Sequence, residues 1–63
     1  MHPCVGDKFE ALKPMGAVIE SDVIEITETS CNWLIGKSNK YEGIKFSWED
    51  FNDDKYLDKW HKL

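Results

Sequence analysis

The sequence predicts an all-β domain in the main, a small and partly open barrel of about five strands with one short helical turn. Three observations lead to this prediction. The chain has only 63 residues, so we expect one domain over residues 1–63, ordered over about 5–60, with a limited core. Apolar and polar residues alternate over several short segments, as in strands with one buried face. Proline, glycine and small polar residues separate these segments.

The first strand is expected over residues 8–12, after an entry at residues 5–7. Alternation places Val5, Phe9 and Ala11 on one face, and Lys8, Glu10 and Leu12 on the other. Proline and glycine then occur close together in residues 13–16, which predicts a loop. A second, very short strand is expected over residues 17–20.

The strongest strand signal covers residues 23–29, which are rich in β-branched side chains. Ile24 and Ile26 fall on one face of this segment and polar residues on the other. Ser21 and Asp22 fit a turn, or a bulge within one long bent strand. We favour the bulge, because small barrels bend their strands in this way.

Two further strands are expected over residues 32–36 and 43–47, joined by a polar hairpin loop through residues 37–41. Alternation points Ile44 and Phe46 into the core. The same block contains Trp33, Tyr41 and Trp48. Trp33 is predicted to join the core and Tyr41 to face water, whereas Trp48 fits either side.

The C-terminal part carries weaker signals. Ser47 resembles a helix N-cap with an acidic first turn, which predicts a short helical turn through Phe51. Residues 53–63 fit a helix, with a loose apolar stripe, and also a strand. We favour a short closing strand near Tyr56 and Leu57, with a frayed end.

Composition limits the classes of function. The net charge is −4, all of which comes from residues 1–31, and arginine is absent. Lysine lacks the forked geometry that grips phosphate and guanine, so a duplex-DNA binder is not expected. The sequence shows no membrane-spanning run and no signal peptide, which favours a cytoplasmic protein. In that compartment Cys4 and Cys31 are expected to be buried or half-buried thiols, although a disulfide between them is conceivable.

The layout of residues 5–58 resembles an SH3-like barrel, through the opening VGDKF and the turn SWEDF before the last strand. This resemblance implies a binding module rather than an enzyme. The compact, acidic, tryptophan-rich and arginine-free composition is also similar to small proteins encoded by phages and prophages of low-GC bacteria. No individual protein family is indicated beyond this layout.

The sequence contains no convincing catalytic or metal site, and no cofactor is expected. His2, Cys4, Cys31 and His61 form a set of zinc-binding residue types, but zinc modules supply their ligands in close pairs, which this spacing lacks. The paired acids near the C-terminus are explained by helix starts and solvation rather than by acid–base catalysis.

Nucleic-acid binding is one alternative function. Lysines and aromatic residues interleave between Trp33 and Trp48, as a platform for a single strand requires. The residues that would form this platform are Trp33, Lys37, Lys40 and Lys45. The acidity of the remaining chain argues against it, because that charge repels phosphate.

Protein binding is the leading expectation. Tyr and Trp are common anchors of interfaces, and acidic residues steer basic partners. Exposed barrel edges also allow strand addition or a homo-oligomer. We therefore expect a non-enzymatic module that binds another protein, itself basic or nucleic-acid-binding, and that inhibits or modulates a host protein if the chain is phage-encoded. A small-molecule-sequestering oligomer is a third possibility. The expected protein-binding residues are Tyr41, Trp48 and Trp60 for contact, and Glu20, Asp22, Glu25 and Glu28 for steering.

Overall fold

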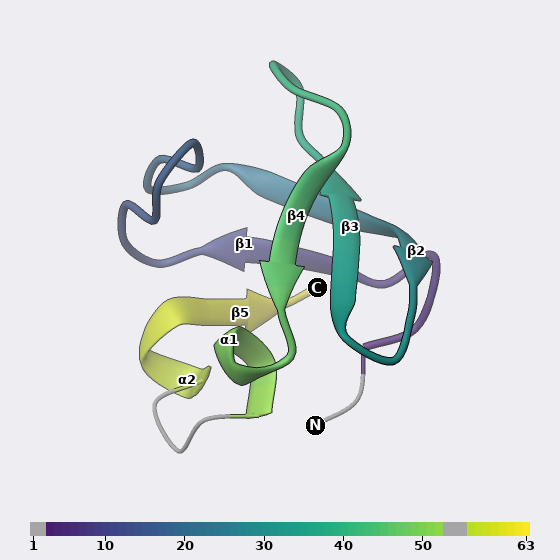
Figure 1. Cartoon of the computed structure of the whole chain (residues 1–63). Coiled ribbons are helices and arrows are strands. Elements are labelled where there is room, and N and C mark those ends of the chain that lie inside the picture. The colour runs from purple at the N-terminus through teal and green to yellow at the C-terminus, as the bar shows by residue number, and fades with distance from the viewer. Residues whose placement is uncertain (1–2, 53–55) are drawn as a thin grey trace.

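The computed structural model describes residues 3–52 and 56–63. Five antiparallel strands form one sheet in the order β4-β3-β2-β1-β5. The sheet is strongly coiled, so that β3 and β4 run across the direction of β1 and β5 in Figure 1. The mainly β, five-stranded part of the fold prediction is confirmed. The elements are β1 (Lys8–Ala11), β2 (Val23–Thr29), β3 (Trp33–Lys37), β4 (Ile44–Ser47), α1 (Glu49–Asn52), α2 (Tyr56–Lys59) and β5 (Trp60–Lys62).

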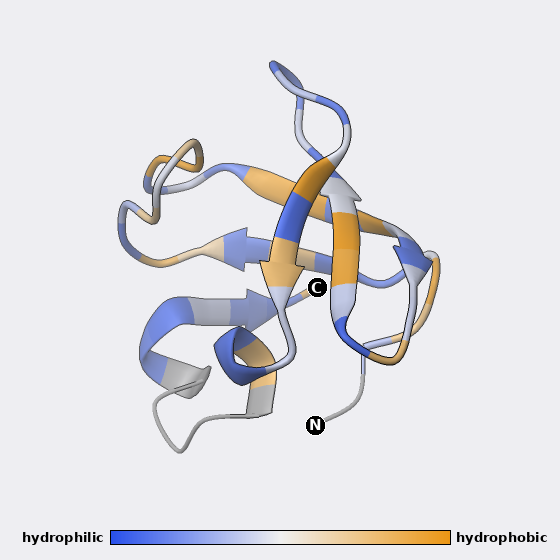
Figure 2. Cartoon of the chain, in the orientation of Figure 1, coloured by the Kyte–Doolittle hydropathy of each residue, from blue (hydrophilic) through white to orange (hydrophobic). Residues whose placement is uncertain are grey.

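The sheet is open, because β4 and β5 form its two ends and do not pair with each other. The two short helices follow β4 and lie together beside β5 (Figure 1). Hydrophobic residues lie along the strands, whereas the loop between β3 and β4 is hydrophilic (Figure 2). None of the helices in the described part of the chain has the length or hydrophobicity needed to span a bilayer.

The core lies on the inner face of the sheet. Four aromatic rings meet there: Phe51 of α1 stacks on Trp60 at 5.1 Å between centroids and 12° between planes, and Phe46 meets Trp60 edge-on at 5.7 Å. Phe9 contacts Phe51 at 5.1 Å. Edge-to-face and offset contacts of this kind stabilise a core beyond the area they bury. The buried residues are Phe9, Ala11, Val18, Ile24, Ile26, Leu34, Phe46, Phe51 and Trp60.

Alternation predicted the faces of three strands correctly. Phe9, Ile24, Ile26 and Phe46 are buried, and Ile44 packs against the core. Val5 does not share the face of Phe9 and Ala11, because it precedes the strand and is 63% exposed.

The prediction for Trp33 is also wrong. Leu34 is fully buried, and Gly36 is buried two residues later, so Trp33 falls on the outer face. Its ring is half-buried there, with the Lys45 ammonium 4.5 Å from the ring centre.

The segment between β1 and β2 differs from the expected strand over residues 17–20. Met15 and Val18 form an isolated antiparallel bridge with two backbone hydrogen bonds, so Gly16 and Ala17 are the central residues of a tight turn. Gly16 has φ 62°, which a two-residue hairpin turn with glycine first requires. Val18 is buried beneath this turn.

Ser21 and Asp22 form a turn and a bulge together. Ser21 has φ 76°, and the Asp22 N–H donates to Ile19 O across the turn. The Ser21 N–H also donates to Ala11 O, while the Ala11 N–H donates to Asp22 O, so both residues oppose Ala11 as in a bulge. The expected bulge is therefore present, but the long continuous strand around it is not, because β2 begins at Val23. A second irregularity lies further along, where the register between β2 and β3 shifts between Ile26 and Glu28.

The C-terminal part is only partly as expected. The helical turn through Phe51 is confirmed as α1, and the Ser47 N–H donates to Asp50 Oδ2 as at a capped helix start. The closing strand expected near Tyr56 and Leu57 is wrong, because these residues lie in α2. The chain closes one turn later, where β5 pairs with β1 in the segment that was expected to fray.

Candidate functional site

The three aromatic residues expected to bind a partner lie in different environments. Tyr41 is 53% exposed in the loop between β3 and β4, where Ser38 Oγ accepts its backbone N–H at 3.1 Å. Trp48 is half-buried directly after β4, and its Nε1 donates to Ser30 O at 2.8 Å. Trp60 is 1% exposed, so its side chain is unavailable to a partner, and the expectation of a surface role was wrong.

Tyr41 and Trp48 are nevertheless related by β4. Tyr41 precedes this strand by three residues, and Trp48 follows it directly. The two residues therefore flank β4 in the sequence, and the Trp48 indole is bonded to the turn between β2 and β3.

The acidic residues do not form one continuous face. Glu20 and Glu28 are exposed, whereas Asp22 is half-buried and accepts the Ile19 N–H at 3.1 Å. Glu25 lies between two lysines, because its register partners are Lys8 on β1 and Lys37 on β3. The steering charge expected of this segment is thus partly neutralised within the sheet.

The outer face of β3 and β4 collects three of the four residues proposed for nucleic acid. Trp33 and Lys37 lie on the outer face of β3, and Lys45 of β4 reaches over the Trp33 ring. Lys40 lies in the loop between the strands. Glu25 and Glu28 share this face, so its lysines are largely balanced by carboxylates.

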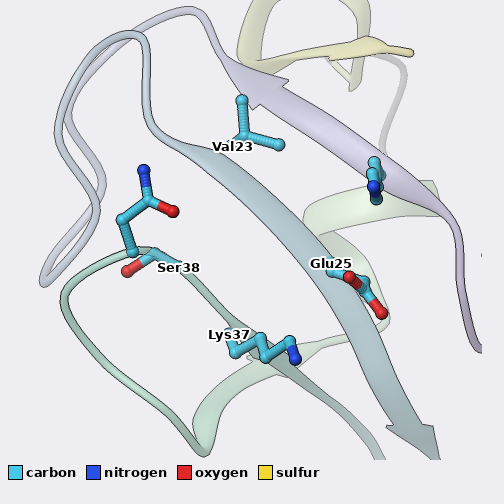
Figure 3. Close-up of a pocket in the computed structure, with 6 residues that line it drawn as sticks. Val23, Glu25, Lys37 and Ser38 are labelled. Atoms are coloured by element: carbon cyan, nitrogen blue, oxygen red, sulfur yellow. The ribbon is translucent and has the colours of Figure 1, made fainter.

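A shallow hollow of about 160 Å³ lies on the same outer face (Figure 3). Its walls carry charges of both signs, and the loop after β3 closes one side. Such a hollow lacks the apolar floor that small-molecule sites usually have. The lining residues are Lys8, Val23, Glu25, Lys37, Ser38 and Asn39.

A larger depression of about 370 Å³, here called the β4 groove, lies at the open side of the sheet. The tight turn at Gly16 and Ala17 forms one wall, β4 forms another, and Asp50 and Trp60 complete it. Most of the lining is apolar and continuous with the core. The lining residues are Met15, Gly16, Ala17, Ile44, Lys45, Phe46, Asp50 and Trp60.

Trp60, which lines this groove, has a buried polar atom. Trp60 Nε1 is inaccessible to solvent and has no hydrogen-bond acceptor in the described structure. A buried donor without an acceptor costs about 1–3 kcal/mol of stability. Trp60 is therefore held in place by its ring contacts and not by its N–H group.

The two charges beside the groove already have partners. Asp50 Oδ1 lies 4.0 Å from Lys59 Nζ, and its other oxygen accepts the Ser47 N–H at 3.3 Å. The Lys45 ammonium is drawn to the Trp33 ring. The other lining residues are glycine and apolar residues.

The cysteines and histidines do not come together. Cys4 and Cys31 are both exposed and are not joined by a disulfide, so the expectation of buried thiols was wrong. In residues 3–52 and 56–63 no three histidine, cysteine or acidic side chains lie close enough to hold a metal ion. His2 lies outside the described residues.

Sequence reasoning missed the groove residues Met15, Gly16, Ala17 and Asp50. The sequence did contain a signal for the turn. Gly16 and Ala17 stand between two apolar residues, and a two-residue hairpin turn often has glycine in its first position. Nothing in the sequence indicated that this turn would stand beside β4, which is about thirty residues away.

Comparison with protein-family models, with curated proteins and with solved structures finds no significant match to this chain. Its function is therefore inferred from the geometry of its own surface.

Proposed function

We propose that this chain is a non-enzymatic binding module that acts by occupying a site on another protein. The observation that carries the proposal is the β4 groove, which combines an apolar floor, an open strand edge and an aromatic residue beyond each end of the strand. Interfaces between proteins have this composition, with an apolar centre and few charges in it.

The arrangement of the elements supports an SH3-like barrel as the scaffold. The sheet order β4-β3-β2-β1-β5, the long segment between β1 and β2, and the helical turns before the last strand all agree with that layout. Domains of this type are mostly binding modules, although fold alone does not define function.

Tyr41 and Trp48 are the proposed contact residues at the two ends of β4. Tyr41 is exposed on a loop held by Ser38, and Trp48 is fixed by its bond to Ser30. Aromatic residues that are already ordered lose little conformational entropy on binding, which favours affinity. Trp60 supports the floor of the groove from below.

The acidic charge of the chain favours a basic partner, including one that itself binds nucleic acid. Glu20 and Glu28 are exposed and supply this steering most directly, with Asp22 and Glu25 contributing less. If the chain is encoded by a phage, the partner is a cytoplasmic protein of the host, and the role is inhibition or modulation of that protein.

The proposal is tested with a variant that obstructs the groove and a matched one that does not. Ala17→Arg adds a long charged side chain at the groove, while Asn39→Arg adds the same side chain to the exposed loop on the outer face. Circular dichroism confirms that both variants are folded. The protein captured from the native cell by the wild type is then purified, and its binding is measured by calorimetry.

The expected result is a loss of affinity of about tenfold or more for Ala17→Arg, which corresponds to about 1.4 kcal/mol or more of binding free energy, and little change for Asn39→Arg. Equal binding by all three proteins would contradict the proposed surface. Titration of the wild type with single-stranded oligonucleotides at low salt separates the nucleic-acid alternative, which predicts quenching of the Trp33 fluorescence.

A further inference from the structure

β4 is an end strand of the sheet, so some of its main-chain N–H and C=O groups point away from β3. The Ser47 N–H donates to Asp50 Oδ2, so this N–H points away from β3. In an antiparallel pair the direction of the main-chain groups alternates along the strand. The N–H and C=O of Lys45, two residues earlier, therefore also point away from β3, towards the open side of the sheet.

The side chains beside this edge suit an extended segment. Ile44 and Phe46 face the groove side, and Lys45 lies between them in sequence and reaches the Trp33 ring on the outer face. In an extended chain that pairs with Lys45, successive side chains also point to opposite faces of the sheet. One of its side chains then enters the groove, and its neighbours lie over the outer face.

The charge next to the groove indicates which side chains a peptide bound along β4 would carry. The two helices that follow β4 contact each other, and their described residues present Glu49, Asp50 and Asp58 against Lys59. This excess of carboxylates favours a lysine or arginine beside the apolar side chain, at the Ser47 end of the strand.

We propose that the partner supplies an extended peptide segment, which adds to β4 as a further strand through the N–H and C=O of Lys45. The segment places an apolar side chain in the β4 groove and a basic side chain near Asp50. This inference rests on the proposed function and specifies its mode of recognition. Strand addition obtains affinity from main-chain hydrogen bonds and specificity from side-chain pockets.

The other end of the sheet provides a matched control. Leu63 N–H donates to Lys8 O, and Leu12 N–H donates to Lys59 O, so the main chain at these positions faces β1. By the same alternation the N–H of Lys62 faces away from β1. Lys62→Pro and Lys45→Pro therefore each remove one outward N–H from an edge strand, where proline is tolerated.

The test uses a library of short random peptides, selected for binding to the wild-type protein. The recovered peptide is synthesised, and its affinity is measured for Lys45→Pro, Lys45→Ala and Lys62→Pro. We expect peptides with alternating apolar residues next to a lysine or arginine. Affinity should fall about tenfold for Lys45→Pro, because one main-chain hydrogen bond is lost and the ring obstructs pairing, and change less than about threefold for the other two.

Several results would overturn strand addition. Recovery of no peptide, or equal weakening by Lys45→Pro and Lys45→Ala, would show that the edge N–H is not used. Sedimentation showing a dimer that Lys45→Pro dissociates would make a second copy of the chain the occupant instead. If Lys45→Pro leaves binding of the purified partner intact while Ala17→Arg abolishes it, the proposed function stands and this mode of recognition fails.

Should Lys45→Pro prove unfolded by circular dichroism, a second measurement replaces it. The recovered peptide is prepared with an N-methyl group at each successive amide, which removes one donor at a time. Strand addition requires a loss of about tenfold at alternate positions only, and a uniform response along the peptide would contradict it.

Discussion

The two ends of the sheet differ in what their strands present. β4 and β5 are both short end strands, and in each of them the main-chain N–H of one lysine, Lys45 or Lys62, points away from the neighbouring strand. β4 lies between exposed Tyr41 and half-buried Trp48, beside the groove. β5 begins with Trp60, which is 1% exposed, and continues with exposed His61 and Lys62. β4 is thus the edge that we propose for recognition, while β5 anchors the end of the chain in the core.

This difference shows that a tryptophan in a small domain has to be assigned from the register of its strand. Trp33 begins a run of three apolar residues, over residues 33–35, and is on the outer face because Leu34 takes the inner position. Trp60 lies in the most ambiguous segment and is central to the core. A shift of one residue in the register of a strand moves a side chain from the core to the outer face of the sheet.

The largest expected effect is that of removing the anchor of β5. Trp60→Ala takes away contacts with Phe9, Phe46 and Phe51, and large aromatic truncations of this kind cost about 3–5 kcal/mol. A small domain has about that much stability in total, so the variant should be unfolded in thermal and denaturant scans. Trp33→Ala is the control and should remain folded. Two variants of equal stability would contradict the assignment of the two tryptophans.

A smaller effect is expected where the strands approach most closely. A Cβ on Gly36 of β3 would lie 2.6 Å from Ile24 Cγ2 and 3.2 Å from a carbon of Phe46. Gly36→Ala should therefore lower the free energy of unfolding by about 1–3 kcal/mol through overpacking beneath β4. Denaturation with urea measures this change. A variant as stable as the wild type would show that β2 and β4 are less tightly packed against β3.

The smallest effect concerns the bond that holds the end of β4. Trp48→Phe keeps an aromatic ring against the core but removes the donor to Ser30 O. The expected loss of stability is about 1 kcal/mol, the usual net value of one hydrogen bond. Thermal unfolding followed by circular dichroism detects it. An unchanged midpoint would show that the Trp48 indole N–H is not held by Ser30 in solution.

Much of the sheet could be predicted from the sequence because its strands are amphipathic. The segment Val23–Thr29 is a strand over the expected residues, and the inward positions of Ile24, Ile26 and Phe46 follow from alternation alone. The helical turn after Ser47 was predicted from local signals, since an N-cap acts within one turn of chain.

The remainder depended on contacts between distant residues, which local patterns do not contain. β5 forms because its main chain pairs with β1 and Trp60 fills the space between Phe46 and Phe51. The groove exists because the turn at Ala17 lies beside β4. Neither contact leaves a signature in the sequence of the segment that makes it. Of the proposed site, only the aromatic residues on either side of β4, Tyr41 and Trp48, were therefore predicted.

Amide hydrogen exchange at Lys45, measured by NMR with and without the bound peptide, tests the central claim most directly. We expect the Lys45 N–H to exchange rapidly in the free protein, because it faces the open edge, and at least about tenfold more slowly in the complex, as a newly formed hydrogen bond requires. The Lys62 N–H should exchange at the same rate in both. A Lys45 amide that is already protected in the free protein, or that binding leaves unchanged, would contradict recognition through the β4 edge.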